Sequence, residues 1–229
     1  MSQEPASPPE VAEATGLPGT DPRPVAHAGP DGPRPCGDPS APRLFLVAGA
    51  SGSGKSRLAH ASGCLAFRLD DFYFDADHPG HVLTDYGIID WDDPASWDAG
   101  AAVVALRALL EAGEVEVPQY SISESRAVGR HTVTLGGCAC VVAEGVFAIE
   151  LLPHLRAAGI PATPIYLDRP GWLVFGLRLR RDLAGKRKPP RVLLRRGWAL
   201  WRAQPSLKRK AVAAGFRPLS MRRALAAIS

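Results

Sequence analysis

Residues 49–56 of this 229-residue chain read Gly49-Ala50-Ser51-Gly52-Ser53-Gly54-Lys55-Ser56. They fit the pattern G-x-x-x-x-G-K-[ST] at every fixed position. The glycines let the backbone curl so that its N–H groups point at a phosphate, and a helix that begins here adds the positive end of its dipole. A lysine at this place reaches the terminal phosphates, and the hydroxyl after it ligates Mg²⁺. The stretch therefore predicts a site for ATP and Mg²⁺ that uses all eight residues.

The sequence on either side of this loop indicates the fold class. Arg43–Ala48 is a short apolar run that predicts a buried strand, and Gly54–Ser62 has the pattern of a helix. Further apolar runs predict strands at 64–69, 138–143 and 164–167, and apolar spacing predicts helices at 97–112, 146–158 and 171–184. Strands that alternate with helices and are apolar throughout imply a parallel sheet covered on both faces. We expect an α/β protein with the P-loop NTPase fold and helices on both faces of a parallel sheet.

Three regions fall outside this alternation. Residues 75–96 are rich in Asp, Pro and Gly and are expected to form a loop. Residues 115–118 and 131–135 are expected to be short strands of a hairpin-like excursion. After residue 184, two basic helical stretches are predicted, with breaks near Pro189-Pro190, Pro205 and Pro218.

The net charge of +4 combines three unlike segments. Residues 1–42 hold 11 of the 22 prolines with two basic and six acidic side chains, and we expect a disordered Pro-rich leader. Residues 43–176 carry nine basic and 16 acidic side chains, whereas residues 177–229 carry 16 basic and one acidic. We expect residues 43–190 to form one domain, and residues 191–229 to form a basic helical segment packed on the same domain.

The cysteines and the apolar runs bear on location. The chain has four cysteines without metal-binding spacing, and Cys64 and Cys140 lie in apolar runs, where we expect buried thiols. Free thiols suit a reducing cytoplasm. No apolar run reaches the roughly 18 residues that a membrane span needs, and no secretory signal is visible at the start. We therefore expect a cytoplasmic protein with no membrane partner.

Acidic side chains follow two of the predicted strands. Asp70 and Asp71 end the second strand, and Glu144 ends the strand at 138–143. In parallel sheets, ligands bind at the carboxyl ends of strands, where a carboxylate can hold Mg²⁺ or accept a proton from an attacking hydroxyl. For Asp70 and Asp71 the alternatives are solvated loop acids or a helix cap. Glu144 follows five apolar residues, and its burial without a partner would be costly.

The segment Asp90–Asp98 combines carboxylates with two tryptophans. Such a combination suits a ligand with vicinal hydroxyls and an apolar face, although a loop that leads into a helix capped by Asp93 or Ser96 would look the same. His78 and His81 lie in a Gly/Pro-containing loop without further metal ligands, so we expect solvated histidines there rather than a metal pair.

Six cations crowd the stretch from Arg178 to Lys188. Helical spacing would place Arg178 and Arg181 on one face. A cationic lid that closes over a transferring phosphoryl group would need such residues. A solvated basic face or a patch for nucleic acid or anionic lipid is the alternative.

Taken together, these motifs resemble the uridine kinase family of P-loop kinases, which is related to phosphoribulokinase and pantothenate kinase. The resemblance covers about residues 43–188. It rests on the order and spacing of Gly49–Ser56, Leu69-Asp70-Asp71-Phe72-Tyr73, Asp90–Asp98, Val117–Tyr120 with Ser125-Arg126, Val141–Ala148, and Arg178–Lys188. It implies a kinase with a cationic lid that uses ATP and Mg²⁺ and phosphorylates a nucleoside or a similar hydroxyl compound.

The resemblance also implies roles for single residues. Asp70 would be the catalytic base, and Asp92 would bind the ribose hydroxyls. Tyr120 would contact the nucleobase, with Arg126 beside it. Ser56, Glu144 and Asp70 would be associated with Mg²⁺. Arg178, Arg181, Lys186 and Lys188 would serve the lid and the phosphates, together with the catalytic Lys55.

One position departs from the family. Glu124 stands where the family has a histidine that reads the pyrimidine, and the loop is one residue shorter. A carboxylate accepts hydrogen bonds but does not donate them at neutral pH, so it cannot replace a donor to a base carbonyl. The acceptor therefore stays open between a nucleoside and another small alcohol such as pantothenate or a sugar phosphate.

The remaining alternative is not enzymatic. The loop at 49–56 would then bind nucleotide as a switch, and the basic tail at 191–229 would bind nucleic acid. The ordered set of Asp70, Asp92 and Glu144 argues against it, because a switch needs no substrate cleft. Assembly into a homo-oligomer is left open.

Overall fold

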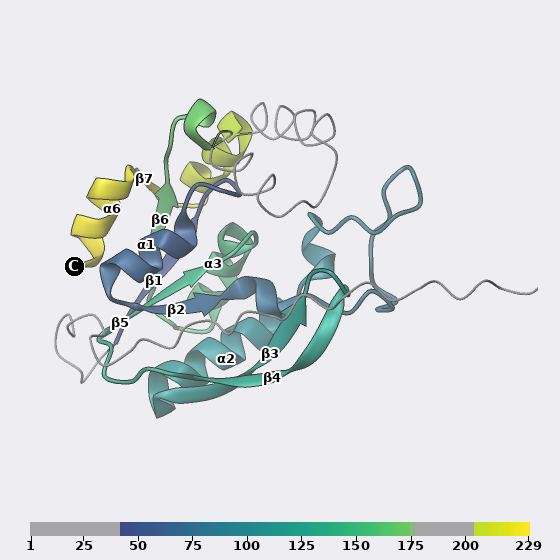
Figure 1. Cartoon of the computed structure of the whole chain (residues 1–229), viewed down its shortest axis with the longest axis horizontal. Helices are drawn as coiled ribbons and strands as arrows, with labels where there is room; N and C mark the ends of the chain where they lie inside the picture. Colours follow the sequence, from purple (N-terminus) through teal and green to yellow (C-terminus); the bar gives the residue numbers. More distant parts are fainter. Residues whose placement is uncertain (1–41, 175, 177–203) are drawn as a thin grey trace, which may run out of the picture. The chain divides into compact units, whose positions relative to one another are not determined.

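We describe the fold from a computed structural model, which defines residues 42–174, 176 and 204–229 (Figure 1). Residues 1–41 of the predicted leader at 1–42 and the lid residues Arg178, Arg181, Lys186 and Lys188 lie outside these described residues. So do most of the predicted helix at 171–184 and the breaks at Pro189-Pro190.

The centre of the fold is a parallel sheet of five strands in the order β2-β5-β1-β6-β7. The strands are β1 (Arg43–Ala48), β2 (Leu65–Arg68), β5 (Cys140–Glu144), β6 (Thr163–Leu167) and β7 (Arg217–Leu219). β1 lies in the middle, and five consecutive residues from Leu44 to Ala48 are buried. Continuous burial is typical of strands covered on both faces. The predicted parallel α/β sheet is confirmed.

Helices cover both faces of this sheet. Alternate residues of β1 enter different cores: Phe45 and Val47 contact one cluster, and Leu44 and Leu46 contact the other. The first core is closed by α1 (Lys55–Ser62) and α6 (Met221–Ile228), and the second by α2 (Ala99–Ala112) and α3 (Ala148–Ala157) (Figure 1). This arrangement leaves the carboxyl end of β1 free to lead directly into the loop at 49–56.

Strand β7 was not predicted. We expected Pro218 to interrupt a basic helical stretch, but Pro218 is the middle residue of β7 and is paired in register with Tyr166. β7 is the last strand in the sheet order, and an edge strand tolerates a residue without an N–H group. Pro205 is the second described residue of a helical segment at 204–213, so it does not break the helix there. Residues 204–229 thus contribute two helices and a strand to this fold.

A second, two-stranded antiparallel sheet consists of β3 (Glu114–Ser121) and β4 (Arg126–Thr134). Both strands are longer than the predicted 115–118 and 131–135. Val117 and Tyr120 of β3 are buried, whereas nearly all of β4 is exposed. The hairpin tip at 122–125 therefore belongs to a sheet that is anchored through β3.

The cysteine prediction is wrong in one respect. Cys64 and Cys140 are buried as expected, but they form a disulfide across a sequence separation of 76 residues. The pairing of β2 with β5 brings them together, because Leu65 and Val141 are register partners. Cys138 is a free cysteine. The disulfide removes the argument from free thiols for a reducing compartment.

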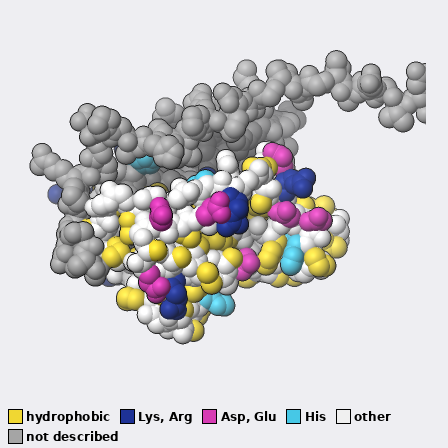
Figure 2. All heavy atoms as spheres, turned by 90° about the horizontal axis from the view of Figure 1, so that it is seen from below, with side chains coloured by type: hydrophobic (Ala, Val, Ile, Leu, Met, Phe, Trp, Pro, Cys, Tyr) yellow, Lys and Arg dark blue, Asp and Glu magenta, His cyan; other side chains and the backbone are white. Residues whose placement is uncertain are grey.

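Two further observations concern the surface. On the face shown in Figure 2, acidic and basic side chains lie among hydrophobic ones and do not gather by sign. Two opposite-charge pairs are Glu116–Arg130 at 2.9 Å and Arg107–Glu111 at 3.9 Å. Of the helices in the described ranges, none combines the length and apolar character that a membrane crossing requires.

Candidate active site

The phosphate-binding loop follows β1 and leads into α1. Gly49, Gly52 and Gly54 have φ values of 155°, 84° and 94°, which L side chains rarely adopt. A Cβ on Gly49 would also lie 3.2 Å from the carbonyl oxygen of Leu167 on β6. Gly54 is the N-cap of α1, so no capping side chain competes with a phosphate for the first-turn N–H groups. The backbone here is shaped to surround an anion.

Lys55 lies across this loop rather than in solvent. Its Nζ donates a hydrogen bond to the carbonyl oxygen of Gly49 at 3.0 Å, and the residue is 9% exposed. The ammonium group is therefore held at the mouth of the loop, where the charge of a terminal phosphate would be met.

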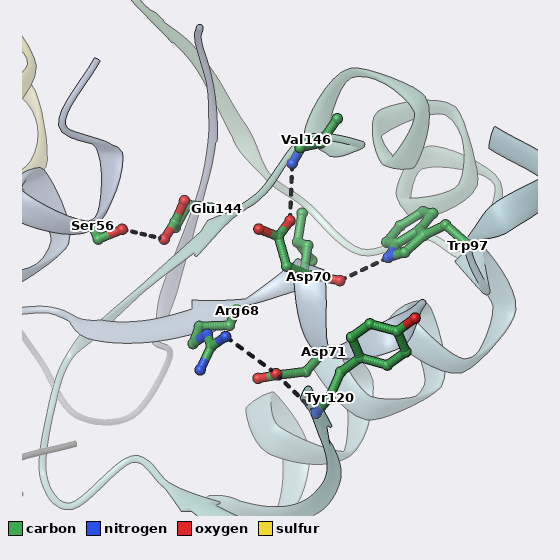
Figure 3. A network of polar contacts seen from close by, with 9 residues as sticks. Ser56, Arg68, Asp70, Asp71, Trp97, Tyr120, Glu144 and Val146 are labelled. Atoms are coloured by element: carbon green, nitrogen blue, oxygen red, sulfur yellow. Dashed lines mark hydrogen bonds and ion pairs between the residues drawn. The ribbon is translucent and has the colours of Figure 1, made fainter. Parts of the chain in front are cut away.

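Ser56 and Glu144 meet at the carboxyl end of the sheet. The Ser56 hydroxyl donates to Glu144 Oε1 at 2.7 Å (Figure 3). Glu144 ends β5, whose register places it beside Val47 of β1 and Arg68 of β2. A hydroxyl and a carboxylate oxygen are ligands that suit Mg²⁺, which keeps several waters and phosphate oxygens in its shell. Within the described ranges, no group of three or more His, Cys, Asp or Glu side chains is placed to hold a metal ion.

Asp70 lies at the same edge of the sheet, in the short 3₁₀ helix η1 (Leu69–Phe72) that follows β2. Its Oδ1 accepts the backbone N–H of Val146 at 3.1 Å (Figure 3). Gly145 allows this approach, because a Cβ there would lie 2.8 Å from Asp70 Oδ1 and 2.6 Å from the Cβ of Leu69. The indole N–H of Trp97 donates to the Leu69 carbonyl oxygen at 2.7 Å and so holds the η1 turn in place. Asp70 is thus held next to the Glu144-Gly145 pair.

Asp71 lies in a different environment from Asp70. It is 2% exposed, lies 3.5 Å from the Arg68 guanidinium, and accepts the backbone N–H of Tyr120 at 3.4 Å (Figure 3). Burial raises the pKa of the Asp71 carboxyl, and the charge of Arg68 partly offsets this. Its contacts tie η1 to β3, whereas those of Asp70 tie η1 to the end of β5.

An aromatic cluster centred on Tyr73 lies beside Asp70. The Tyr73 ring lies 5.8 Å from Trp91, 5.6 Å from Tyr120 and 5.6 Å from Phe147. Burial raises the pKa of the Tyr73 hydroxyl, and the nearby charges of Asp70 and Asp92 raise it further. The structure therefore brings Asp70, Asp92 and Tyr120 together around a residue to which the sequence reasoning gave no role.

The predicted acceptor residues differ in their surroundings. Asp92 is exposed, and its N–H donates to Asp90 Oδ1 at 3.1 Å. Tyr120 is buried, and its hydroxyl donates to the Phe74 carbonyl oxygen at 3.3 Å. Glu124 lies in the hairpin tip, where its carboxylate accepts from the Ser121 hydroxyl at 3.2 Å. Arg126 is exposed at the start of β4. Asp92 and Tyr120 therefore lie next to Tyr73, whereas Glu124 lies in the hairpin tip and Arg126 directly after it.

The expectations for the loop at 75–98 need correction at two points. His78 and His81 are not simply solvated: His78 stacks on Phe74 at 4.0 Å, and His81 meets Trp91 edge-on at 5.0 Å. Asp93 does cap a helix, but it is the short η2 (Pro94–Ser96), whereas Asp98 caps α2. Both histidine rings therefore pack against an aromatic ring, as expected for a side chain with an apolar body and a polar tip.

A cavity of about 270 Å³ adjoins the loop at 49–56. Its lining includes Ala50 and Ser53 of the loop, together with Asp168, Gln204 and Lys208. Lys208 Nζ and Asp168 Oδ2 are 2.7 Å apart. Ser53 is 1% exposed, and its hydroxyl has no hydrogen-bond partner among the described residues. The lining combines these polar groups with apolar residues such as Leu167 and Val174, a mixture that suits the nucleoside part of a nucleotide.

Known proteins were compared with the chain, and no protein-family model matches it. A uridine kinase from Shewanella amazonensis is 30% identical over 155 residues, which cover 62% of this chain and 69% of that protein. The chain belongs to the uridine kinase-like family of P-loop kinases. A uridine kinase from Schizosaccharomyces pombe is 28% identical over 151 residues, but this chain spans only 32% of that protein's length.

A solved structure supports the fold of this family member. It is described, only provisionally, as a fructose transport system kinase from Silicibacter sp. TM1040. It superposes with a TM-score of 0.51 at 18% identity and covers 79% of this chain and 89% of its own. At that identity the likeness concerns the fold alone, and it confirms the predicted P-loop architecture.

Sequence reasoning missed several residues of this kinase-like site. Tyr73 stands in the quoted run after Asp70, and its place beside the predicted base was the available signal. Gln204 and Lys208 lie beyond the stretch that resembles the family, so no motif pointed to them. Asp168 ends a predicted strand, as Glu144 does, and could have been found by the same reasoning.

Proposed function

We propose that this chain is a kinase that transfers the γ-phosphate of ATP to a hydroxyl of a nucleoside or a similar small compound. The observation that carries the proposal is the meeting of three elements at one edge of the sheet. These are the loop at 49–56, the Ser56–Glu144 pair at 2.7 Å, and Asp70 held against Gly145 beside the aromatic cluster. A nucleotide switch would need the first two but not the third.

On the nucleotide side, the backbone of Gly49–Ser56 would surround the phosphates and Lys55 would neutralise the terminal one. Ser56 and Glu144 would hold Mg²⁺, and Asp70, at the same edge of the sheet, would contact the water shell of the metal. The metal, when bound, neutralises charge that develops on the transferred group. The cavity lined by Ser53 and Lys208 would take the nucleoside part of ATP.

For the base, the surroundings favour Asp70 over Asp71. Asp71 is buried and engaged by Arg68 and the Tyr120 backbone, so it has no access to an acceptor. Asp70 lies at the carboxyl end of the sheet, is only partly buried, and accepts the N–H of Val146 through Oδ1. We infer that Asp70 accepts the proton of the attacking hydroxyl.

On the acceptor side, Asp92 would bind vicinal hydroxyls, and Tyr73 and Tyr120 would contact a ring. Arg126 and Glu124 would lie near the far end of the acceptor. The carboxylate of Glu124 can accept from an amino or N–H group, but it cannot donate to a carbonyl. This observation favours keeping a second acceptor class, pantothenate or a sugar phosphate, beside the nucleosides.

The proposal also includes a lid outside the described ranges, the bounds of the kinase domain, and the location and partners of the protein. Arg178, Arg181, Lys186 and Lys188 would form a lid that closes over the phosphates and excludes water. Residues 43–190 would form the kinase domain, with 191–229 packed on it. A cytoplasmic location remains a prediction, assembly into a homo-oligomer is left open, and binding of nucleic acid is left open only for residues 191–229.

The test is a phosphorylation screen with purified protein, Mg²⁺ and ATP. The acceptor panel contains nucleosides, pantothenate and sugar phosphates, and ADP release is compared with and without each acceptor. The proposal expects release that depends on at least one acceptor, with nucleosides preferred. Preference for pantothenate or a sugar phosphate would keep the kinase and change the acceptor, whereas no acceptor dependence for any class would overturn the proposal.

A further inference from the structure

The segment from Asp70 to Ala76 runs beside the tip of the β3–β4 hairpin and contacts both of its strands. Asp71 Oδ1 accepts the N–H of Tyr120 on β3 at 3.4 Å. Asp75 Oδ1 accepts the N–H of Ala127 on β4 at 2.7 Å. Tyr120 and Ala127 are register partners across the hairpin. Two carboxylates of one short segment therefore accept hydrogen bonds from the two residues of a single register pair.

This register pair lies at the point where the pairing of the hairpin is irregular. The register shifts between Gln119 and Tyr120, which is the mark of a β-bulge. A bulge leaves a residue unpaired, disturbs the local ladder and bends the strand. Backbone N–H groups at such a place need acceptors from elsewhere, and Asp71 and Asp75 supply them. The shape of the hairpin tip thus depends on these two side chains.

Other contacts hold the tip to the same segment. The N–H of Ala76 donates to the Ser125 carbonyl oxygen at 2.9 Å. The Tyr120 hydroxyl donates to the Phe74 carbonyl oxygen at 3.3 Å, and the Tyr120 ring lies 5.6 Å from Tyr73. The first residue of the segment is Asp70. The distance between the hairpin tip and the inferred base is therefore set by a few consecutive residues.

We propose that Asp71 and Asp75 are positioning residues that hold the hairpin tip at a fixed place relative to Asp70 and so set the affinity for the acceptor. This inference rests on the proposed kinase function. Neither carboxylate needs to touch the acceptor. They act through Tyr120 and Arg126, which the hairpin carries, while the nucleotide side of the site is built from other elements.

The test rests first on Asp75, which is only partly buried and belongs to neither hydrophobic cluster. Asp75→Ala removes the acceptor for the Ala127 N–H, whereas Asp75→Asn keeps an oxygen there. A hydrogen bond to a charged group of this kind corresponds to roughly a tenfold change. We expect KM for the acceptor to rise about tenfold in Asp75→Ala, with KM for ATP unchanged and near-normal values in Asp75→Asn.

The matched control is Glu116→Ala. It removes the 2.9 Å ion pair with Arg130 in the same hairpin, away from the tip, and should leave both KM values unchanged. Asp71→Ala and Asp71→Asn repeat the comparison for β3, with circular dichroism as the check of folding because Asp71 is buried. If Asp71→Ala does not fold, the Asp75 pair decides.

Hydrogen exchange of the wild type and Asp75→Ala separates the possible results. Faster exchange in the peptides around 120–127, together with a raised acceptor KM, supports the inference. Faster exchange with an unchanged acceptor KM overturns it and leaves a purely structural role. If the wild-type protein phosphorylates no acceptor, the proposed function fails, and the acceptor role of Asp71 and Asp75 fails with it.

Discussion

Gly145→Ala tests the placement of Asp70 without removing any functional group. A Cβ at this position would lie 2.6 Å from the Leu69 Cβ and 2.8 Å from Asp70 Oδ1. Carbon–carbon contacts are comfortable at about 3.5–4.0 Å, so the first overlap is about 1 Å. Leu69 is fully buried and its Cβ is fixed to the η1 backbone, so relief of this contact must shift the backbone that carries Asp70.

The expected effect follows from this geometry. Overpacking of this kind costs about 1–3 kcal/mol of unfolding free energy. A displacement of about 1 Å at a reacting group can reduce turnover about a hundredfold. We expect kcat to fall between about tenfold and a hundredfold, with KM for ATP unchanged because the atoms nearest to the new methyl group belong to Leu69 and Asp70 rather than to the loop at 49–56.

Steady-state kinetics with the best acceptor of the wild type, together with urea denaturation, make the comparison. The control is Gly129→Ala on β4, where the nearest atom to a new Cβ is Gln119 Oε1 at 3.9 Å. It changes the same residue type without a clash and should behave as the wild type. If Gly145→Ala keeps kcat within twofold of this control, Asp70 does not act from the position described here.

Three further predictions follow from other parts of the molecule. Ser56→Ala removes the hydroxyl that lies 2.7 Å from Glu144, and we expect the Mg²⁺ concentration for half-maximal turnover to rise about tenfold; an unchanged Mg²⁺ titration would contradict the assignment. Burial, and then the charge of Asp75, raises the pKa of Tyr120 from 10.0 to about 12. Since the folded state holds this proton more tightly, the stability contributed is lost as pH rises from 10 toward 12, and urea denaturation of Tyr120→Phe should show less loss than the wild type over that range. Reduction of the Cys64–Cys140 disulfide opens a loop of 76 residues and should lower the unfolding free energy by about 4 kcal/mol, measured by urea denaturation with and without dithiothreitol; equal values would argue against the bond.

The parts of the fold that follow local patterns could be predicted from the sequence. β1 and α1 are predicted because an apolar run, a glycine-rich loop and helical spacing follow one another without interruption. β7 was missed because Pro218 is a strong break signal, and only the edge position in the sheet makes it acceptable. The Cys64–Cys140 disulfide was missed because it depends on the pairing of two strands that are far apart in sequence.

The site likewise has features that the sequence could predict and features that it could not. Ser56 and Glu144 could be paired in advance, because the carboxyl ends of parallel strands meet at one edge of a sheet. The separate surroundings of Asp70 and Asp71 could not, since neighbouring residues in a 3₁₀ turn point in directions that only tertiary contacts fix. The cluster around Tyr73 combines aromatic residues from the run at 72–74, the loop at 91 and β3. No spacing in the sequence predicts that these residues come into contact.

The central claim is that Asp70 receives the proton of a hydroxyl that takes the γ-phosphate of ATP. The direct measurement follows transfer of isotope-labelled γ-phosphate to the acceptor by mass spectrometry, in the wild type and in Asp70→Asn, with ATP binding measured separately. Asp77→Asn, a change at an exposed acid in the next loop, is the control. The account predicts labelled acceptor from the wild type and the control, and a rate about a thousandfold lower in Asp70→Asn with ATP affinity unchanged. Near-normal transfer by Asp70→Asn, or no labelled acceptor from the wild type, would contradict it.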